Sequence, residues 1–464
     1  MATNRYIKKV NKDRTTELLV MLVLLFSALG VVFSMGGFNY GRFLTIAIAF
    51  YALSLDRDSL LCMIMFSLPF SSMLKLSMDS FSVISLLCLL LILKLFSDKR
   101  ISISPTSLLC FILFIAIQFV SILLYDATYQ SVISLLLSAA FVMFTSAHYN
   151  APNTDSSGLL VRASMCFSVS TSLMLLLSDI FPRLPYLVHS TKYAELAAAN
   201  RYGATVLDPN ELAQIILIAV GLLIAVMPSL KSKLAKVFSI IMILYMAITG
   251  IRTNSKSYVI SIVLLFAFLM FVYIRVVAKR EGTTKAFYRV LPVLLIAVIG
   301  CVFLFVNFVL PVFEARSSEQ TDVLTNRTGI WGDYVKALSM RTDVALWGCG
   351  AGNVSSIMKM VGRTTSVVPH NTYLEYIIQF GLFGMILLFV SWKNMFKQIK
   401  VKLNTYYILP LVAFLITSFG ISVNSNDCPY ILFALLSLPL AENNAPQILQ
   451  ARKRGYKYGK KALS

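Results

Sequence analysis

Long apolar runs, repeated along almost the whole chain, restrict this sequence more than any other feature. A helix needs roughly 20 apolar residues to cross the hydrocarbon core of a bilayer. Runs near that length occur at approximately 18–35, 43–55, 59–74, 80–96, 106–124, 130–147, 159–180, 211–228, 237–251, 257–275, 290–311, 372–391, 407–422 and 430–441. The runs 43–55 and 430–441 are short enough for re-entrant or buried helices. We therefore expect an all-α polytopic membrane protein with about 12–14 transmembrane helices.

The composition agrees with this interpretation and excludes several other classes. Of the 464 residues, 58% are hydrophobic and 13% are charged, whereas about a quarter of the residues in an ordinary soluble domain are charged. A cytosolic globular enzyme is therefore excluded. The seven cysteines include no Cys-x-x-Cys pair, so the sequence indicates neither a redox motif nor a zinc site.

The positions of the basic residues predict the orientation in the membrane. The net charge is +20, from 41 basic and 21 acidic residues. Lys and Arg are retained on the cytoplasmic side, and they gather in alternate connections such as 231–236, 275–289 and 393–402. The opposite connections are about half as basic, although they include the longest loops. We expect both termini in the cytoplasm, an uncleaved first span, and no nucleic-acid partner.

Four regions follow from this topology. Residues 1–311 hold transmembrane helices 1–11, with a short outer loop at 181–210. Residues 312–371 form a large extracytoplasmic loop, 372–441 hold helices 12–14, and 442–464 form a basic cytoplasmic tail. A loop of about 60 residues is uncommon unless it is functional. Within it, residues 329–338 read as an amphipathic helix, with Ile330, Tyr334 and Leu338 on one face.

Two segments on the outer side combine a helix start with an arginine. In Leu-Asp-Pro-Asn-Glu-Leu-Ala at 207–213, Asp208 is a helix cap, and such a helix start also binds anions. With Arg201 upstream, Asp208 and Asn210 are candidate substrate-binding residues. Arg327 opens the amphipathic helix against the helix dipole, which indicates either a solvated arginine or one with an anionic partner.

Arg252 lies in the short connection Arg-Thr-Asn-Ser-Lys between two spans. It is either an interfacial anchor or a phosphate ligand, for which its planar fork is well suited. Arg341 also lies on the outer side and, like Arg201, is a candidate substrate-binding residue. The turn Leu-Trp-Gly-Cys-Gly-Ala-Gly-Asn at 346–353 allows a backbone phosphate nest. It has no following Gly-Lys-Ser/Thr, and a plain irregular turn is the favoured interpretation.

The segment Pro-His-Asn-Thr-Tyr-Leu-Glu at 369–375 is the most informative. His370 is either a loop histidine or a base, since its pKa near 6.5 lets it take a proton at neutral pH. Asn371 and Glu375 share a helical face and can orient a bound sugar. By contrast, Asp-Arg-Asp at 56–58 resembles a metal-binding Asp-x-Asp, but no loop is present there to complete a site. We interpret His148 and His189 as loop histidines.

In their order and spacing, these motifs resemble the O-antigen polymerase/O-antigen ligase superfamily of bacterial membrane glycosyltransferases. The resemblance covers about residues 200–390. It consists of an Asp-Pro-Asn-Glu segment, an arginine after Thr-Gly, an arginine shortly before a tryptophan in the long loop, and a His-Asn-x-x-Leu segment before a glycine-containing span.

The resemblance implies a GT-C-like fold and a metal-independent glycosyl transfer without a cofactor, at the outer face of the bacterial plasma (inner) membrane. The implied donor is an oligosaccharide on undecaprenyl diphosphate. Arg252 and Arg327 would hold the diphosphate, and His370 would take the proton of the acceptor hydroxyl. Membrane lipids, a flippase and a chain-length regulator are the further partners that it implies.

Several functions remain open at this point. The first is a polymerase that joins repeat units of O-antigen, capsule or exopolysaccharide, and the second is a ligase that passes a glycan to a lipid or other acceptor. A polysaccharide flippase is an alternative of another class, and a structural scaffold is a third class. Transporters place their binding groups near the middle of the membrane, whereas the spans here hold few ionisable groups, chiefly Lys94, Arg162 and Glu375.

Overall fold

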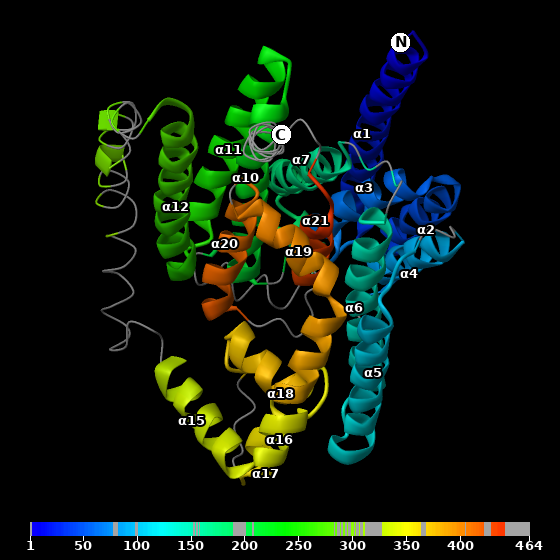
Figure 1. Ribbon diagram of the computed structural model, residues 1–464, viewed down its shortest axis with the longest axis vertical. Helices are drawn as coiled ribbons and strands as arrows, with labels where there is room; N and C mark the ends of the chain where they lie inside the picture. Colours follow the sequence, from blue (N-terminus) through cyan, green and yellow to red (C-terminus); the bar gives the residue numbers. More distant parts are fainter. Residues whose placement is uncertain are drawn as a thin grey trace, which may run out of the picture.

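The structure is a computed structural model (Figure 1). It describes residues 2–77, 82–97, 101–188 without 152, 153, 155 and 157, 201–282 without 207, isolated positions from 284 to 310, 327–362, 368–403, 405–421 and 428–440. Across these residues the regular structure is helical and contains no strand, and eight helices are long and apolar enough to cross a membrane. The predicted all-α polytopic class is confirmed.

The eight long helices match eight of the predicted spans. They are α1 (Ala2–Gly36), α5 (Pro105–Tyr125), α6 (Tyr129–Tyr149), α7 (Leu159–Ile180), α10 (Pro209–Val226), α11 (Lys233–Arg252), α12 (Lys256–Glu281) and α18 (Thr372–Ser391). The predicted span 290–311 and the tail 442–464 lie largely or wholly outside the described residues.

Five further predicted spans are shorter helices. They are α2 (Phe38–Ser54), α3 (Arg57–Ser67), α4 (Val83–Phe96), α20 (Ile408–Thr417) and α21 (Cys428–Ser437). In α3 every residue from Leu60 to Ser67 is buried, and Pro69 directly follows in a 3₁₀ turn. A helix that is apolar all round packs inside a protein. The run at 59–74 is therefore a helix buried inside the bundle and does not span the bilayer.

The centre of the bundle is formed by α10, which packs against α7, α11, α12 and α20. In its most apolar stretch 78% of the residues are buried, compared with 28% in α5, α11 and α12. Gly221 permits close packing against α20, because a Cβ atom there would lie 2.9 Å from the backbone nitrogen of Pro410. The peripheral helices thus present apolar side chains outward, as a membrane requires.

Three short helices form a separate module beside the first half of α18. They are α15 (Arg327–Met340), α16 (Thr342–Trp347) and α17 (Ser356–Met360), and they gather at the bottom of Figure 1. The predicted amphipathic helix at 329–338 is confirmed within α15, where Tyr334 is fully buried. We call the cluster that this module shares with α18 the small core; it comprises Tyr334, Ala337, Val344, Cys349, Val354, Ile357, Met358, Leu374 and Ile378.

α18 is broken at Gly381, whose φ of 61° and ψ of 174° are not helical. The break frees backbone carbonyls, which must find donors inside a membrane protein. The Gly-rich turn at 346–353 supplies these donors. The N–H of Cys349 donates to the carbonyl of Ile378 at 2.8 Å, and the N–H of Gly350 donates to the carbonyl of Gln379 at 3.0 Å. The turn interpretation is therefore confirmed, and the turn fastens the module to the kink.

Candidate functional site

Most of the predicted site residues lie where the ends of α7, α10, α11, α12, α15, α18 and α20 meet. Asn210, in the first turn of α10, connects several of them. Its backbone N–H and its side-chain amide both donate to Asp208 Oδ1, at 2.7 and 2.9 Å. Asp208 thus caps α10 as predicted. The amide oxygen of Asn210 accepts from Ser255 Oγ at 2.7 Å and from Arg201 Nη2 at 3.4 Å.

Arg327 approaches the same place from the start of α15. Its Nη1 donates to the carbonyl of Gly420, just after α20, at 3.2 Å. A Cβ on Gly420 would lie 3.1 Å from this Nη1 and 3.2 Å from Ser257 Cβ, so Gly420 packs closely against both Arg327 and the start of α12. Burial lowers the pKa of Arg327, and the nearby Asp208 carboxylate opposes that shift. An arginine keeps its charge in proteins, so the site holds a partly buried cation.

His370 lies beside Arg327 at the entry to α18. Burial lowers the pKa of its imidazole, Arg327 lowers it further, and Asp208 raises it. The ring is therefore neutral at neutral pH and can accept a proton. Asn371 caps α18 by accepting from the N–H groups of Tyr373 and Leu374, at 3.1 and 3.2 Å.

The loops that surround the site have unusual backbone conformations. Ala204, Asn254 and His370 have φ values of 47°, 50° and 48°. Across the described residues, Asp126 is the one further non-glycine position with positive φ. Such conformations cost of order 1–3 kcal/mol each and gather at functional sites. Three of them lie in the loops around Asn210 and Arg327, which favours this region as the candidate functional site.

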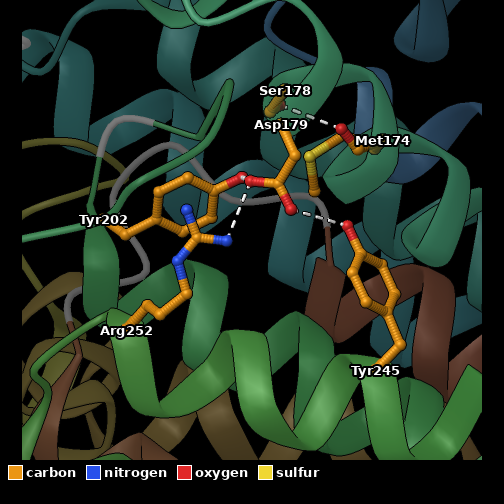
Figure 2. Close-up of polar contacts among 6 residues, drawn as sticks. All are labelled: Met174, Ser178, Asp179, Tyr202, Tyr245 and Arg252. Atoms are coloured by element: carbon orange, nitrogen blue, oxygen red, sulfur yellow. Dashed lines mark hydrogen bonds and ion pairs between the residues drawn. The ribbon is translucent and has the colours of Figure 1, made fainter.

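Arg252 ends α11 at the border of this group (Figure 2). Its Nη1 donates to Asp179 Oδ1 at 2.8 Å, and its guanidinium carbon lies 4.3 Å from the centre of the Tyr202 ring. The N–H of Tyr202 in turn donates to the carbonyl of Arg252 at 3.1 Å. Arg252 is therefore joined to Arg201 and Ser255 through the backbone, while its side chain faces Asp179.

Asp179 and Ser257 were not among the sequence candidates. Asp179 is one of the last residues of α7, and its sequence neighbourhood contains no partner. The signal that the sequence offered for Asp179 was its position, as an acidic residue at the end of a predicted span. Its significance depends on Tyr202 and Arg252, which only the fold brings to it.

The remaining predicted residues lie in two other places. Glu375 is fully buried one turn into α18 and, together with burial, raises the pKa of Tyr334 to about 12. Arg341 lies apart from the group. It pairs with Asp343 through two hydrogen bonds of 2.9 and 2.7 Å, and Asp343 accepts from Tyr125 at 2.9 Å. These contacts fasten α16 to the end of α5.

The Asp-Arg-Asp segment and His148 form a structural cluster at the opposite end of α7. Asp56 caps α3 by accepting from Ser59 N–H at 2.8 Å. Asp58 pairs with Arg162 at 3.1 Å and accepts from Tyr149 at 3.0 Å. His148 is buried at the end of α6, 3.4 Å from Arg57 Nη1, rather than in a loop as predicted. His189 lies outside the described residues.

Comparison with protein families bears directly on this arrangement. Residues 241–389 match the family model described as O-antigen ligase. This segment is similar to the O-antigen ligase family. It runs from α11 to α18 and includes Arg252, Arg327 and His370. The predicted resemblance to the O-antigen polymerase/O-antigen ligase superfamily is confirmed. No curated protein and no solved structure gives a match.

The family indicates an enzyme of glycosyltransferase type, with ligase-like or polymerase-like activity. It also indicates a multi-pass membrane protein that acts on a lipid-linked glycan.

Proposed function

We propose that the protein is a polysaccharide polymerase that joins undecaprenyl-diphosphate-linked repeat units at the outer face of the plasma membrane. The observation that supports this most is the proximity of a partly buried arginine, Arg327, and a neutral imidazole, His370, at helix ends near Asp208. A leaving diphosphate needs a fixed cation, and an attacking hydroxyl needs a base.

In the proposed reaction, the arginines act on the donor. The bond between the anomeric carbon and the diphosphate oxygen breaks, and its electron pair stays with the diphosphate, which gains charge. Arg327 and Arg252 would stabilise that charge. Fixed guanidinium groups are effective because they require no reorganisation during the reaction. Arg201, which donates to Asn210, would add a third basic side chain to this region.

His370 acts on the acceptor. The acceptor hydroxyl oxygen forms a bond to the anomeric carbon, and its proton passes to the imidazole, which its lowered pKa keeps neutral. Asp208 and Asn371 already serve as helix caps, so they would contribute their remaining acceptor capacity to sugar hydroxyls. Asn210 and the buried Glu375 would orient the glycan. The proposed step uses neither a metal nor a cofactor.

A ligase that transfers a lipid-linked glycan to another acceptor is the second candidate, because the matching family is described as O-antigen ligase. Both reactions use the same bond changes and differ in the acceptor alone.

The test uses purified protein, a synthetic undecaprenyl-diphosphate oligosaccharide and a metal chelator. Wild type is compared with His370→Asn, because asparagine tolerates the left-handed backbone at this position. A ladder of longer lipid-linked glycans that the variant does not make supports the polymerase. Transfer to an added lipid acceptor without a ladder means a ligase. Movement of the substrate across vesicles without a new glycosidic bond means a flippase and overturns the proposal.

A further inference from the structure

The Asp179 carboxylate, which accepts from two tyrosine hydroxyls, also holds the guanidinium of Arg252. Asp179 Oδ1 accepts from Arg252 Nη1 at 2.8 Å and from the Tyr202 hydroxyl at 3.1 Å. The other oxygen, Oδ2, accepts from the Tyr245 hydroxyl at 2.9 Å. Figure 2 shows Asp179 between the two tyrosines, with the guanidinium lying along the Tyr202 ring. Both carboxylate oxygens are therefore occupied.

These contacts fix the direction of the guanidinium. The carboxylate sets the position of Nη1, and the ring sets the plane of the group, as cation–π contacts do. Burial and Asp179 raise the pKa of the Tyr202 hydroxyl, so it remains a donor. Among the described residues these contacts engage Nη1 and one face of the guanidinium, which leaves Nε and Nη2 as donors for a ligand. The Arg252 side chain is 49% exposed and accessible to such a ligand.

We propose that Asp179 is a positioning residue, which with Tyr202 and Tyr245 orients Arg252 so that its free N–H groups face a lipid diphosphate. This inference rests on the proposed function. Without the carboxylate, a half-exposed arginine side chain would sample many rotamers, and ordering it would reduce the binding free energy. Removal of the Asp179 carboxylate also makes the region more positive. This change does not compensate for the loss of binding free energy, because exposed charges are screened by water and salt.

A purely structural role makes a different prediction, and the chain contains its own control. At the other end of α7, Asp58 pairs with Arg162 at 3.1 Å and accepts from Tyr149 at 3.0 Å. The Asp58 and Asp179 side chains are similarly exposed, at 32% and 26%. Both sets join α7 to a neighbouring helix through Asp, Arg and Tyr. If Asp179 does no more than hold two helices together, Asp58→Asn and Asp179→Asn have the same effect on activity and lipid binding.

The experiment compares wild type, Asp179→Asn, Tyr245→Phe and Asp58→Asn in lipid nanodiscs. Steady-state rates are measured against the concentration of the undecaprenyl-diphosphate oligosaccharide. Binding of undecaprenyl diphosphate without a glycan is measured separately by displacement of the radiolabelled lipid. Partners that orient a binding group at metal sites are worth about 10-fold or more. We expect the same scale here: a KM about 10-fold higher for Asp179→Asn, with weaker lipid binding.

Tyr245→Phe keeps the ion pair and loses one hydrogen bond, so KM rises by a smaller factor in the same direction. Asp58→Asn leaves KM and lipid binding as in wild type. Equal effects of Asp58→Asn and Asp179→Asn, or a loss of active enzyme at unchanged KM, overturn the positioning role. If Asp179→Asn does not fold, Tyr245→Phe decides by the same criterion.

The two proposals fail separately. A wild type that forms no glycosidic bond overturns the proposed function. In that case the lipid-binding measurement still tests Asp179, because unchanged binding of undecaprenyl diphosphate in Asp179→Asn overturns the positioning role.

Discussion

At the scale of single residues, His370 combines two features that are unfavourable for stability. Its backbone has a φ of 48°, which is uncommon for residues other than glycine and asparagine. Its ring is partly buried beside a cation, Arg327. The backbone conformation lowers the stability of the fold, and burial beside Arg327 disfavours the protonated imidazole. The second feature suits a base that must stay neutral until it receives a proton.

The first prediction concerns removal of the imidazole. His370→Asn is expected to lower kcat by about 10²–10⁴-fold, the usual contribution of a general base. The unfolding temperature stays close to that of wild type, because asparagine adopts the left-handed conformation easily. Rate assays and thermal unfolding in detergent measure the two quantities. A variant that retains most of its kcat contradicts the role of His370 as the base.

The second prediction concerns pH. The lowered pKa of His370 means that the neutral, proton-accepting form persists below pH 6.5, the ordinary value for histidine. As the pH falls through the lowered pKa, the imidazole gains a proton and the rate decreases. The acidic limb of kcat/KM therefore has its midpoint below 6.5.

A matched variant tests the assignment of this limb. The Asp208 carboxylate raises the pKa of His370, so Asp208→Asn should move the midpoint to still lower pH while it keeps a good helix cap. A midpoint at or above 6.5 in wild type is inconsistent with His370 as the titrating base.

The sequence was sufficient to name Arg201, Asp208, Asn210, Arg252, Arg327 and His370 as candidates, because polar residues at the ends of apolar runs are few and their order resembles a known family. Their roles stay predictions. It was not sufficient to find Asp179. This residue acquires a role only through Tyr202, Tyr245 and Arg252, which come from three other places in the chain. It was also insufficient to separate Arg341 from the other arginines, because its partners Asp343 and Tyr125 are far from each other in sequence.

At the scale of elements, the kink of α18 could not be predicted, because the sequence Gly-Leu-Phe-Gly continues the apolar run. The kink exists because the Gly-rich turn supplies two N–H donors to the carbonyls of Ile378 and Gln379. The approach is close: a Cβ on Gly381 would lie 2.4 Å from the backbone nitrogen of Gly348.

The third prediction follows from this packing. Gly381→Ala places a side chain in a backbone region that is essentially restricted to glycine, so we expect destabilisation by at least about 2 kcal/mol. Thermal unfolding in detergent measures it. Gly332→Ala in α15 is the matched control, since its Cβ meets no atom within 4 Å and alanine favours a helix by about 1 kcal/mol. Equal stability of the two variants would show that the kink is not tightly constrained.

At the scale of the whole molecule, the apolar runs located the long helices well, because a bilayer fixes both their length and their polarity. They did not separate spanning helices from short interior ones such as α3, because burial in protein and burial in lipid select the same side chains. The distribution of charge predicts the orientation, with α15 outside and α19 (Lys393–Lys402) in the cytoplasm.

The fourth prediction tests that orientation. Ser339 in α15 and Lys397 in α19 are exposed and lie near opposite ends of α18. A membrane-impermeant maleimide should label Ser339→Cys in right-side-out vesicles and Lys397→Cys in inverted ones. The native protein in each vesicle type shows the background from its own cysteines. The reverse pattern would place the proposed site in the cytoplasm.

The small core and the apolar core of the main bundle meet at the proposed site. This has a consequence for how the site is assembled. Arg327 and His370 begin α15 and α18, whose nearest apolar residues belong to the small core. Arg201, Asn210 and Arg252 belong to the main bundle, and Gly381 lies at the boundary. The position of His370 and Arg327 relative to Arg201 and Arg252 therefore depends on how the small core packs against the main bundle. Buried side chains of the small core such as Ile378 and Val354 are consequently expected to affect the alignment of the reacting groups.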